Sequence, residues 1–418
     1  MATLSNRRNF LITLWVFLCT LIPAAAANAG NGFVQVRGTQ LVDGAGQPLF
    51  LRGIGLGNWL LPEGYMWHFK HAVGPRQIHE VVAQLIGDAG ARRFWAEWRE
   101  RYITAADVRL IRELGFNSVR LPLHHGLFID PARPDEPTGP GWALLDRFIG
   151  WCKAEGIYVL LDLHGAPGGQ TGTGIDDSPG YPFLFIDAES QDLTVALWRQ
   201  LASRYRDEPI VLGYDLLNEP IADFFDQDRL NPRLAPLYRR LIAAIREVDP
   251  HHIIMLGGAQ WNTNFEAAGE PSAPNLVYTF HTYWTDPTEK SIAPYLAYRE
   301  KHQVPLYLGE AGENTDEWIQ KFCALMEEHR IDWCFWPYKK MDATSSVLSI
   351  HPPEGWETIR AFADAPRGSY EEIRAARPPE AVSARALQQL LDNLTVEHCR
   401  LNEGYVRALG LKVPVKAE

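Results

Sequence analysis

Positive charge is scarce in this chain of 418 residues. The sequence has 40 Lys and Arg residues against 51 Asp and Glu residues, which gives a formal net charge of −11. A nucleic-acid-binding protein needs a basic surface to contact phosphates. The composition therefore argues against a nucleic-acid partner and against binding to an anionic membrane surface, whereas a neutral, hydroxylated ligand would be unaffected by it.

Cysteine is also rare, with five residues in the chain. Cys19 falls in the N-terminal segment, and Cys152, Cys323, Cys334 and Cys399 are widely spaced. Zinc sites bring cysteines together in C-x-x-C pairs, and the sequence has none. We therefore predict no metal site, and we expect buried free thiols because the surroundings of most of these cysteines are apolar.

Beyond the N-terminus, the sequence lacks any apolar run long enough to cross a bilayer. The N-terminal segment has Arg7 and Arg8 before an apolar stretch at 10–22, followed by the small-residue sequence Ala27-Asn28-Ala29. This is the order of a signal peptide. We predict a signal peptide at residues 1–29, similar to twin-arginine signals or else an ordinary secretory signal, and a periplasmic or extracellular mature protein that leaves the membrane after cleavage.

Two catalytic motifs of other enzyme classes are missing or incomplete. No G-x-S-x-G sequence occurs, which argues against an esterase. Gly53, Gly55 and Gly57 follow a predicted strand as in dinucleotide loops, but an aromatic loop at 59–69 comes next instead of a helix. We therefore predict that the protein uses no cofactor.

What the sequence does have is an eightfold alternation of apolar strands and helices. Such a series, with no hairpin inside it, predicts an α/β fold of the (β/α)8 TIM barrel type. The predicted strands are 49–54, 117–121, 157–163, 210–217, 253–256, 276–280, 304–309 and 332–335. The predicted helices are 76–114, 144–155, 193–205, 234–248, 293–302, 318–329 and 355–363, the last as the eighth barrel helix.

Both ends of the chain add to this barrel. Segments 33–37 and 41–44 predict a small hairpin that caps the bottom of the barrel. Residues from about 368 are charged and rich in alanine, with a helical pattern at 381–393. We therefore divide the mature chain into a catalytic barrel at 30–366 and a helical C-terminal extension at 367–418 that packs on it.

Two predicted strands end in a glutamate. Asn218 and Glu219 follow the apolar run 210–217, and Glu310 follows 304–309. Carboxylates are costly to bury without partners, so both acids should lie where a strand opens onto a site. Two glutamates facing one substrate are what glycoside cleavage requires, one to protonate the leaving oxygen and one to attack the sugar carbon.

Other polar and aromatic residues follow the same pattern. They lie at or just after the carboxyl ends of predicted strands, where barrel enzymes place their sites. Each could have a structural role on its own, but their placement on one face favours a shared site. They are Arg120, His164, Asn218, His281, Tyr283 and Trp336.

On these residues the chain resembles family 5 of the glycoside hydrolases. Asn218-Glu219-Pro220 is similar to the acid/base motif of that family, and Leu308-Gly309-Glu310 is similar to its nucleophile motif. The stretch 162–170 is similar to the strand-three loop of the exo-β-1,3-glucanase branch. The resemblance covers most of the mature chain but neither the loops beyond Gln170 nor the C-terminal helices.

The resemblance implies a retaining β-glycoside hydrolase that acts on a β-glucan-type polysaccharide or oligosaccharide. It assigns Glu310 as nucleophile, held by Arg120 and Tyr283, and Glu219 as general acid and base. In this assignment Asn218 binds the sugar 2-hydroxyl. His164 and His281 position hydroxyls or Glu219, and Trp336 lies beneath the reacting sugar.

Several alternatives remain open. The enzyme could be an exo-acting β-glucosidase or exo-β-1,3-glucanase, or the barrel could bind carbohydrate without cleaving it. Trp59, Trp261 and Trp284 are candidates for further stacking on sugars, although core packing explains each equally well. Glu313 is interpreted as a solvated acid in the first turn of a helix. We expect a monomer.

Overall fold

Eight parallel strands close into a barrel in the computed structural model, which describes residues 32–414. The predicted signal peptide at 1–29 lies outside the described residues. Strand β11 pairs with β4 and closes the barrel, so the predicted (β/α)8 architecture is confirmed. The barrel strands are β4 (Arg52–Gly55), β5 (Ser118–His124), β6 (Tyr158–Gly165), β7 (Val211–Asp215), β8 (Ile253–Gly257), β9 (Leu276–His281), β10 (Leu306–Glu310) and β11 (Asp332–Phe335).

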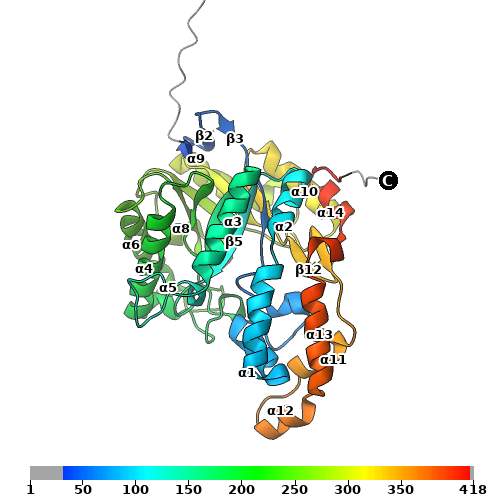
Figure 1. Cartoon of the computed structure of the whole chain (residues 1–418). Helices are drawn as coiled ribbons and strands as arrows, with labels where there is room; N and C mark the ends of the chain where they lie inside the picture. The colour runs from blue at the N-terminus through cyan, green and yellow to red at the C-terminus, as the bar shows by residue number, and fades with distance from the viewer. Residues whose placement is uncertain (1–31, 415–418) are drawn as a thin grey trace, which may run out of the picture.

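Helices return the chain from one strand to the next on the outside of the barrel (Figure 1). Their ends follow local chemistry: the side chain of Asp187 accepts from Ser190 N at the start of α4, and Gly156 ends α3 at φ 67°. The connecting helices are α2 (Ala105–Leu114), α3 (Gly141–Glu155), α4 (Ala188–Tyr205), α6 (Leu234–Arg246), α9 (Glu289–His302) and α10 (Asp316–Glu328), with short α7 (Ala259–Asn262) and α8 (Phe265–Ala268) after β8.

The amino-terminal end of the barrel is closed by the predicted hairpin. Strands β1 (Gly32–Arg37) and β2 (Gln40–Gly44) pair antiparallel, and β3 (Pro48–Leu49) adds a third strand. Val34 and Leu41 pack in one cluster with side chains of the barrel interior such as Met255 and Val277. Burial of these apolar side chains fixes the hairpin as the bottom of the barrel and leaves the carboxyl ends of the strands open.

The long helical region at 76–114 forms two helices. Helix α1 (Pro75–Arg101) is interrupted at Gly87, whose φ of 72° is not helical, and α2 starts after a turn capped by Thr104 and Asp107. Helix α2 is the crossover to β5. Helix α1 packs instead against α13 (Glu380–Asp392) in the lower part of Figure 1.

The eighth barrel helix differs from the prediction. Helix α11 (Trp356–Ala363) packs on α1 and α13. Its first residue also contacts the loop before α1, because the Trp356 ring stacks on Phe69 and its indole donates to Trp67 O. The position beside α10 belongs to α14 (Glu403–Ala408), and Lys412 N donates to Leu114 O at the end of α2. A helix of the C-terminal extension thus completes the barrel.

The extension is joined to the barrel by a small sheet and a buried cation. Strand β13 (Leu348–Ile350) lies between β12 (Lys339–Met341) and β14 (Arg400–Leu401). The ammonium of Lys339 pairs with Asp107 and donates to Leu394 O in the extension. Helix α12 (Tyr370–Ala376) precedes α13. The division of the chain at residues 366 and 367 stays a prediction.

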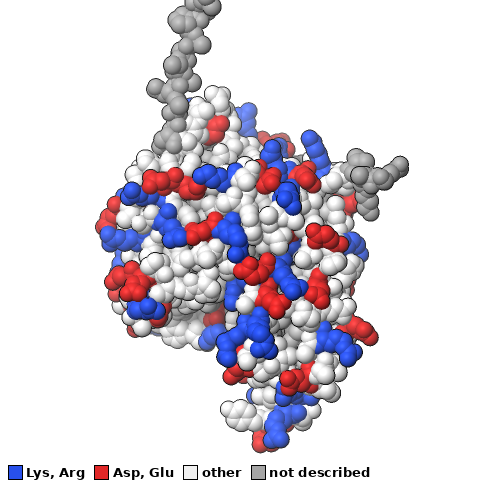
Figure 2. Space-filling view, viewed as in Figure 1, with Lys and Arg blue, Asp and Glu red and all other residues white. Residues whose placement is uncertain are grey.

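The distribution of charged side chains and the state of the cysteines can be compared with what the composition predicts. Figure 2 shows acidic and basic residues interspersed over the face that carries α1, α3 and α4. The four cysteines from Cys152 to Cys399 are free, and three of them are buried. Between residues 32 and 414, no helix combines the length and the apolar character that spanning a membrane would require.

Candidate active site

The eight predicted site residues meet at the carboxyl end of the barrel. Arg120, His164, His281 and Glu310 lie within strands β5, β6, β9 and β10, and the other four follow strands β7, β9 and β11. All except Tyr283 are buried to at least nine-tenths. The backbone at Glu219 adopts φ 46°, a left-handed conformation that is rare for a residue other than glycine.

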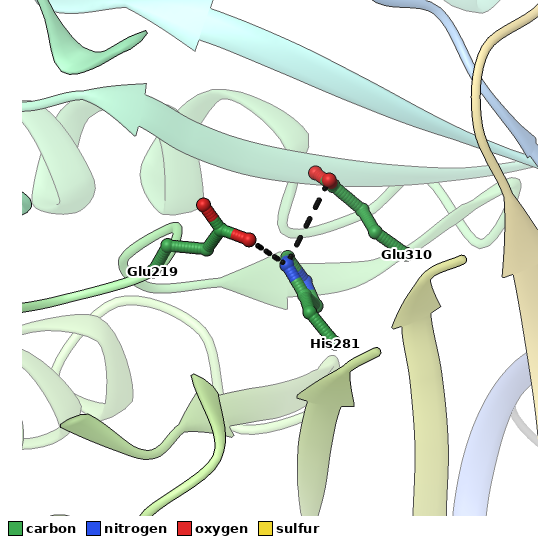
Figure 3. A group of neighbouring side chains, drawn as sticks. All are labelled: Glu219, His281 and Glu310. Carbon is green, nitrogen blue, oxygen red and sulfur yellow. Dashed lines mark hydrogen bonds and ion pairs between the residues drawn. The ribbon is translucent and has the colours of Figure 1, made fainter. Parts of the chain in front are cut away.

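The two glutamates lie on either side of His281 (Figure 3). Nδ1 of His281 is 2.9 Å from Oε1 of Glu219 and 3.7 Å from Oε2 of Glu310. Ligand atoms of these three residues all lie within 4.8 Å of one another. The carboxyl groups are therefore near the separation of about 5–5.5 Å typical of retaining glycosidases, and too close for the roughly 6.5–9.5 Å of inverting ones.

Both carboxylate oxygens of Glu310 accept a hydrogen bond. Nη1 of Arg120 donates to its Oε1 over 2.5 Å, and the hydroxyl of Tyr283 donates to its Oε2 over 2.9 Å. Burial raises the pKa of the Tyr283 hydroxyl well above its usual value, with the Glu310 charge acting in the same direction. Tyr283 therefore stays a hydrogen-bond donor, and the two donors fix the position of the Glu310 carboxyl group.

Arg120 also contacts two aspartates that sequence reasoning did not single out. Its guanidinium lies 3.0 Å from Asp162 and 2.9 Å from Asp215, and it donates to Asn218 Oδ1 over 2.8 Å. Burial raises the pKa of Asp162 to about 7 and that of Asp215 to about 7. The buried guanidinium of Arg120 thus contacts three carboxyl groups and one amide, and these contacts fix the orientation of its planar group.

Glu219 has the environment of a proton donor. Burial raises its pKa to about 7. Burial also lowers the pKa of His281 to about 3, so the imidazole beside Glu219 is neutral and can donate only one hydrogen bond. Among the described residues, this imidazole is the hydrogen-bond partner of the Glu219 carboxyl group, and Oε2 is the atom left for a substrate.

Asp162, His164 and Asn218 are connected by a second set of hydrogen bonds. Nδ1 of His164 donates to Asp162 over 2.7 Å, and Nε2 lies 3.2 Å from the amide nitrogen of Asn218. Burial lowers the pKa of His164 to about 4, so its Nε2 is an acceptor for that amide. The Asn218 side chain is thereby fixed at both ends, by Arg120 on the oxygen and His164 on the nitrogen.

Trp336 forms one wall of the site. Its ring stacks on His164 with centroids 5.8 Å apart and planes 6° apart, and its indole donates to the Tyr65 hydroxyl over 2.8 Å. A Cβ atom at Gly55 or Gly57 would collide with this ring. The glycines that resembled a dinucleotide loop therefore make room for an aromatic side chain.

A cavity of about 610 Å³ opens over these residues. It includes Glu63, which sequence reasoning missed: this side chain is 5% exposed, its Oε1 has no hydrogen-bond partner in the described chain, and burial raises its pKa well above its usual value. Its only sequence signal was its position in the aromatic loop after β4. The lining residues are Glu63, Tyr65, His164, Ile175, Glu219, Trp261, Thr263, His281, Thr282, Tyr283, Trp284, Thr285, Glu310, Glu313 and Trp336.

The structure places the three tryptophans that were considered for stacking on sugars, and Glu313, in different surroundings. Trp261 and Trp284 line the cavity, and Trp284 is 74% exposed. Trp59 is buried in the core, and its indole donates to Arg99 O. The prediction of Glu313 as a solvated acid is wrong, because Lys340 binds it 2.5 Å away at the cavity wall.

Glu219, His281 and Glu310 also form the one cluster between residues 32 and 414 with the spacing of metal ligands. Its chemistry does not favour a cation, because the Arg120 guanidinium already contacts Glu310 and its charge would repel a second cation. The imidazole nitrogen in the cluster is also bonded to Glu219. The absence of a bound metal stays a prediction.

Several known proteins are similar in sequence to this chain. The family model Cellulase (glycosyl hydrolase family 5) matches residues 81–342. A Beta-xylosidase from Phanerodontia chrysosporium is 32% identical over 290 residues, which are 69% of this chain and 59% of that protein. Endoglucanase C from Acetivibrio thermocellus is 27% identical over 318 residues, 60% of this chain and 88% of that protein.

Solved structures share the fold. The crystal structure of rutinosidase from Aspergillus niger superposes with a TM-score of 0.57 and 17% sequence identity, and the match covers 70% of this chain and 90% of that one. At this identity the likeness shows the barrel alone.

Proposed function

The chain belongs to glycosyl hydrolase family 5, and from this premise we propose that it hydrolyses β-glycosidic bonds with retention of anomeric configuration. The observation that carries the proposal is the pair of carboxyl groups, Glu219 and Glu310, within 4.8 Å across the mouth of the barrel. At that separation one carboxylate can reach the sugar carbon while the other reaches the leaving oxygen.

In the first step, an oxygen of ionised Glu310 attacks the anomeric carbon. The glycosidic C–O bond breaks, and Glu219 transfers its proton to the departing oxygen. The hydrogen bonds from Arg120 and Tyr283 hold Glu310 in position until then, and burial raises the pKa of Glu219 to about 7, so that this carboxyl group keeps its proton below pH 7. The two acids have opposite environments, which is the arrangement that acid and nucleophile require.

In the second step, Glu219 has lost its proton and acts as the base. It removes a proton from a water molecule, which attacks the anomeric carbon and releases Glu310. Asn218 is the residue we propose for the sugar 2-hydroxyl, because its amide is fixed by Arg120 and His164 beside both acids. The stacked Trp336 ring would support the sugar from below.

The substrate class we propose is a β-glucan-type polysaccharide or oligosaccharide. The cavity walls also favour the second candidate, an exo-acting β-glucosidase or exo-β-1,3-glucanase. On the side of β4, the cavity is lined by the buried Glu63 and by Tyr65, and the ammonium of Lys340 lies 4.6 Å from the centre of the Tyr65 ring. On the side of β8 and β9, the cavity is bordered by Trp284, which is exposed to solvent. A pocket of this kind would accept one sugar at the end of a chain.

Azide rescue tests the two roles separately. With a reactive aryl β-glycoside, Glu219→Ala should form the covalent intermediate and then yield the β-glycosyl azide, because azide replaces the water. Glu310→Ala should yield the α-glycosyl azide, because azide replaces the nucleophile. Glu313→Gln, at the cavity wall but outside the pair, is the matched control and should keep turnover.

Three results would contradict the proposal or refine it. Near-normal hydrolysis by either alanine variant would rule out the assigned roles. Sugar binding without cleavage by the wild type, across β-1,3-, β-1,4- and mixed-linkage glucans, mannan and aryl β-glucosides and β-xylosides, would instead support the non-catalytic barrel. Single glucose units as products from the longer glucans would identify exo action.

We also propose that the protein is exported and works as a monomer. The support for export is the order of charged, apolar and small residues at 1–29. Replacing both Arg7 and Arg8 with lysine should stop export if the twin-arginine route is used, as judged by cell fractionation, and should leave a general secretory signal working. Analytical ultracentrifugation of the mature chain tests the oligomeric state.

A further inference from the structure

Strand β9 places a threonine directly beneath the histidine of the site. Side chains alternate along a strand, so Val277, Thr279 and His281 all point into the barrel. Val277 belongs to the apolar cluster of the barrel interior, whereas Thr279 is fully buried and polar. Its neighbours toward the mouth of the barrel include Gly257, its register partner on β8, and Gly309 on β10.

Two polar atoms in this layer lack hydrogen-bond partners. Among the described residues, nothing pairs with Nε2 of His281 or with the hydroxyl of Thr279, and both atoms are buried. A Cβ atom on Gly309 would collide with the Thr279 hydroxyl and would lie 2.7 Å from Nε2 of His281. The two atoms therefore both lie against the backbone of Gly309, a close approach that is possible because residue 309 has no side chain.

A third unpartnered group lies on the same side. The amide of Asn262 is buried with neither its oxygen nor its nitrogen bonded, and it occupies the place where a Cβ of Gly257 would be. Buried polar groups are satisfied by protein or by ordered water, and a water molecule needs two to four polar partners. A hydroxyl, an imidazole nitrogen and an amide can supply them.

We propose that Thr279 is a positioning residue for the acid/base glutamate, acting through His281. Its hydroxyl donates to Nε2 of His281, directly or through one buried water, and so holds the imidazole in the neutral tautomer that carries its proton on Nδ1. That proton then points at Oε1 of Glu219, 2.9 Å away. The inference rests on the proposed role of Glu219.

The tautomer matters because Glu219 must be an acid in one step and a base in the next. With Nδ1–H donating to Oε1 in both steps, the exchangeable proton has to reside on Oε2, the oxygen free to face the substrate. In the other tautomer a lone pair on Nδ1 faces Oε1. Glu219 could then pair with His281 only by placing its own proton on Oε1, away from the leaving oxygen.

Among the described residues, none of the other charged or titratable groups around Glu219 is hydrogen-bonded to the hydroxyl of Thr279. They are Arg120 on β5, Asp162 and His164 on β6, Tyr283 after β9, Glu310 on β10 and Glu63 in the loop after β4. A substitution at residue 279 should therefore act on Glu219 through His281 and leave these electrostatic contributions in place.

Nitrogen NMR of histidine-labelled protein tests the tautomer without any turnover. His281→Gln identifies the His281 signals by their disappearance. Wild type and Thr279→Ser should show a protonated Nδ1 and an unprotonated Nε2, whereas Thr279→Val should show a mixture or a protonated Nε2. Where valine prevents folding, Thr279→Ala removes the hydroxyl without adding a methyl group.

A second readout is the pH profile of kcat/KM. Loss of the Nδ1–H donor should favour the protonated form of Glu219 and move the alkaline limb up by about one pH unit, the size of one hydrogen bond to a carboxylate. Thr279→Ser should restore the wild-type limb. An Nε2–H tautomer in wild type, or an Nδ1–H tautomer that survives in both variants without a hydroxyl, would overturn the inference. Failure of the proposed function would appear elsewhere, as turnover that survives loss of Glu219.

Discussion

Nη1 of Arg120 donates to Oε1 of Glu310 over 2.5 Å inside the mouth of the barrel, where the arginine is fully buried. The same guanidinium contacts Asp162 and Asp215, so the position of the proposed nucleophile depends on a cation that is itself held from behind. Five donors in a rigid plane make this possible, and the single ammonium of lysine cannot reproduce it.

Arg120→Lys should therefore keep the positive charge at residue 120 but lose the planar set of donors that holds Glu310. We expect kcat/KM to fall by about 100-fold or more, the effect of displacing a reacting group by about 1 Å. Arg120→Met should in addition lower the free energy of unfolding by roughly 3–5 kcal/mol, because it leaves buried carboxylates unpaired. Steady-state kinetics and urea unfolding measure the two effects.

The control is Arg204→Lys, which alters an arginine–carboxylate pair with Asp146 on the surface. That variant should change stability by less than about 1 kcal/mol and leave kinetics unaltered. Equal losses in the two lysine variants would show that the Arg120 contacts have no special role.

The pKa of Glu219 sets the pH range of the proposed reaction. Because burial raises that pKa to about 7, the carboxyl group is protonated below pH 7 and loses its proton above it. The first step needs the protonated form, so kcat/KM should fall as pH rises through about 7. A plot of kcat/KM against pH for an aryl β-glycoside with a poor leaving group measures this limb.

A substrate whose leaving group needs no protonation is the internal control for that limb. With a dinitrophenyl glycoside, the decline near pH 7 should weaken or disappear, since the acid is not required for departure. An alkaline limb that is the same for both substrates would mean that another group titrates there.

Much of the site was predictable because barrel topology brings the carboxyl ends of all eight strands to one rim. Glu219 and Glu310 stand at strand ends in the sequence, so their meeting follows from the fold. Asp162 and Asp215 gave no such signal, because each lies within an apolar strand. Their role is visible only once Arg120 is placed between them.

The features that the sequence did not predict lie in segments where apolar residues show no helical or strand periodicity. Glu63 is in a loop between Trp59 and Phe69 whose conformation depends on contacts with distant residues such as Trp356. Helix α14 is six residues long, too short for a helical pattern to stand out. Its packing on α10, and not its local sequence, makes it the eighth barrel helix.

Lys339 connects the barrel to the extension, and its loss should destabilise both. The ammonium pairs with Asp107, and it donates to Tyr102 O over 2.7 Å and to Leu394 O over 2.8 Å, with no exposure to solvent. Lys339→Met leaves Asp107 buried without its cation, so the free energy of unfolding should fall by about 3–5 kcal/mol.

A surface pair between the same two regions is the matched control. Arg101 on α1 pairs with Asp392 on α13, and both side chains are more than one-third exposed. Arg101→Ala should lower the free energy of unfolding by less than about 1 kcal/mol. If urea unfolding shows similar losses for the two variants, burial of the Lys339 pair contributes nothing beyond an ordinary surface contact.

Variants of Glu63 and Trp284 test which end of the cavity holds the sugar that is cleaved off. Glu63 is buried beside Trp336 and its Oε1 lacks a partner in the described chain, so a sugar hydroxyl there would complete its hydrogen bonds. Glu63→Gln should lower kcat/KM by up to about 10-fold, the effect of one hydrogen bond to an uncharged group, because burial raises the pKa of the Glu63 carboxyl group and favours its neutral form. Trp284 is 74% exposed, so Trp284→Ala should act only on substrates long enough to reach it.

Comparing an aryl monoglycoside with a trisaccharide separates the two ends. If the reacting sugar lies against Glu63 and the leaving group lies toward Trp284, Glu63→Gln impairs both substrates equally, because both place the same sugar there. Trp284→Ala should raise KM for the trisaccharide alone, by about 10-fold for one lost stacking contact. The reverse pattern, with Glu63→Gln affecting only the longer substrate, would place the reacting sugar elsewhere and would remove the structural argument for exo action.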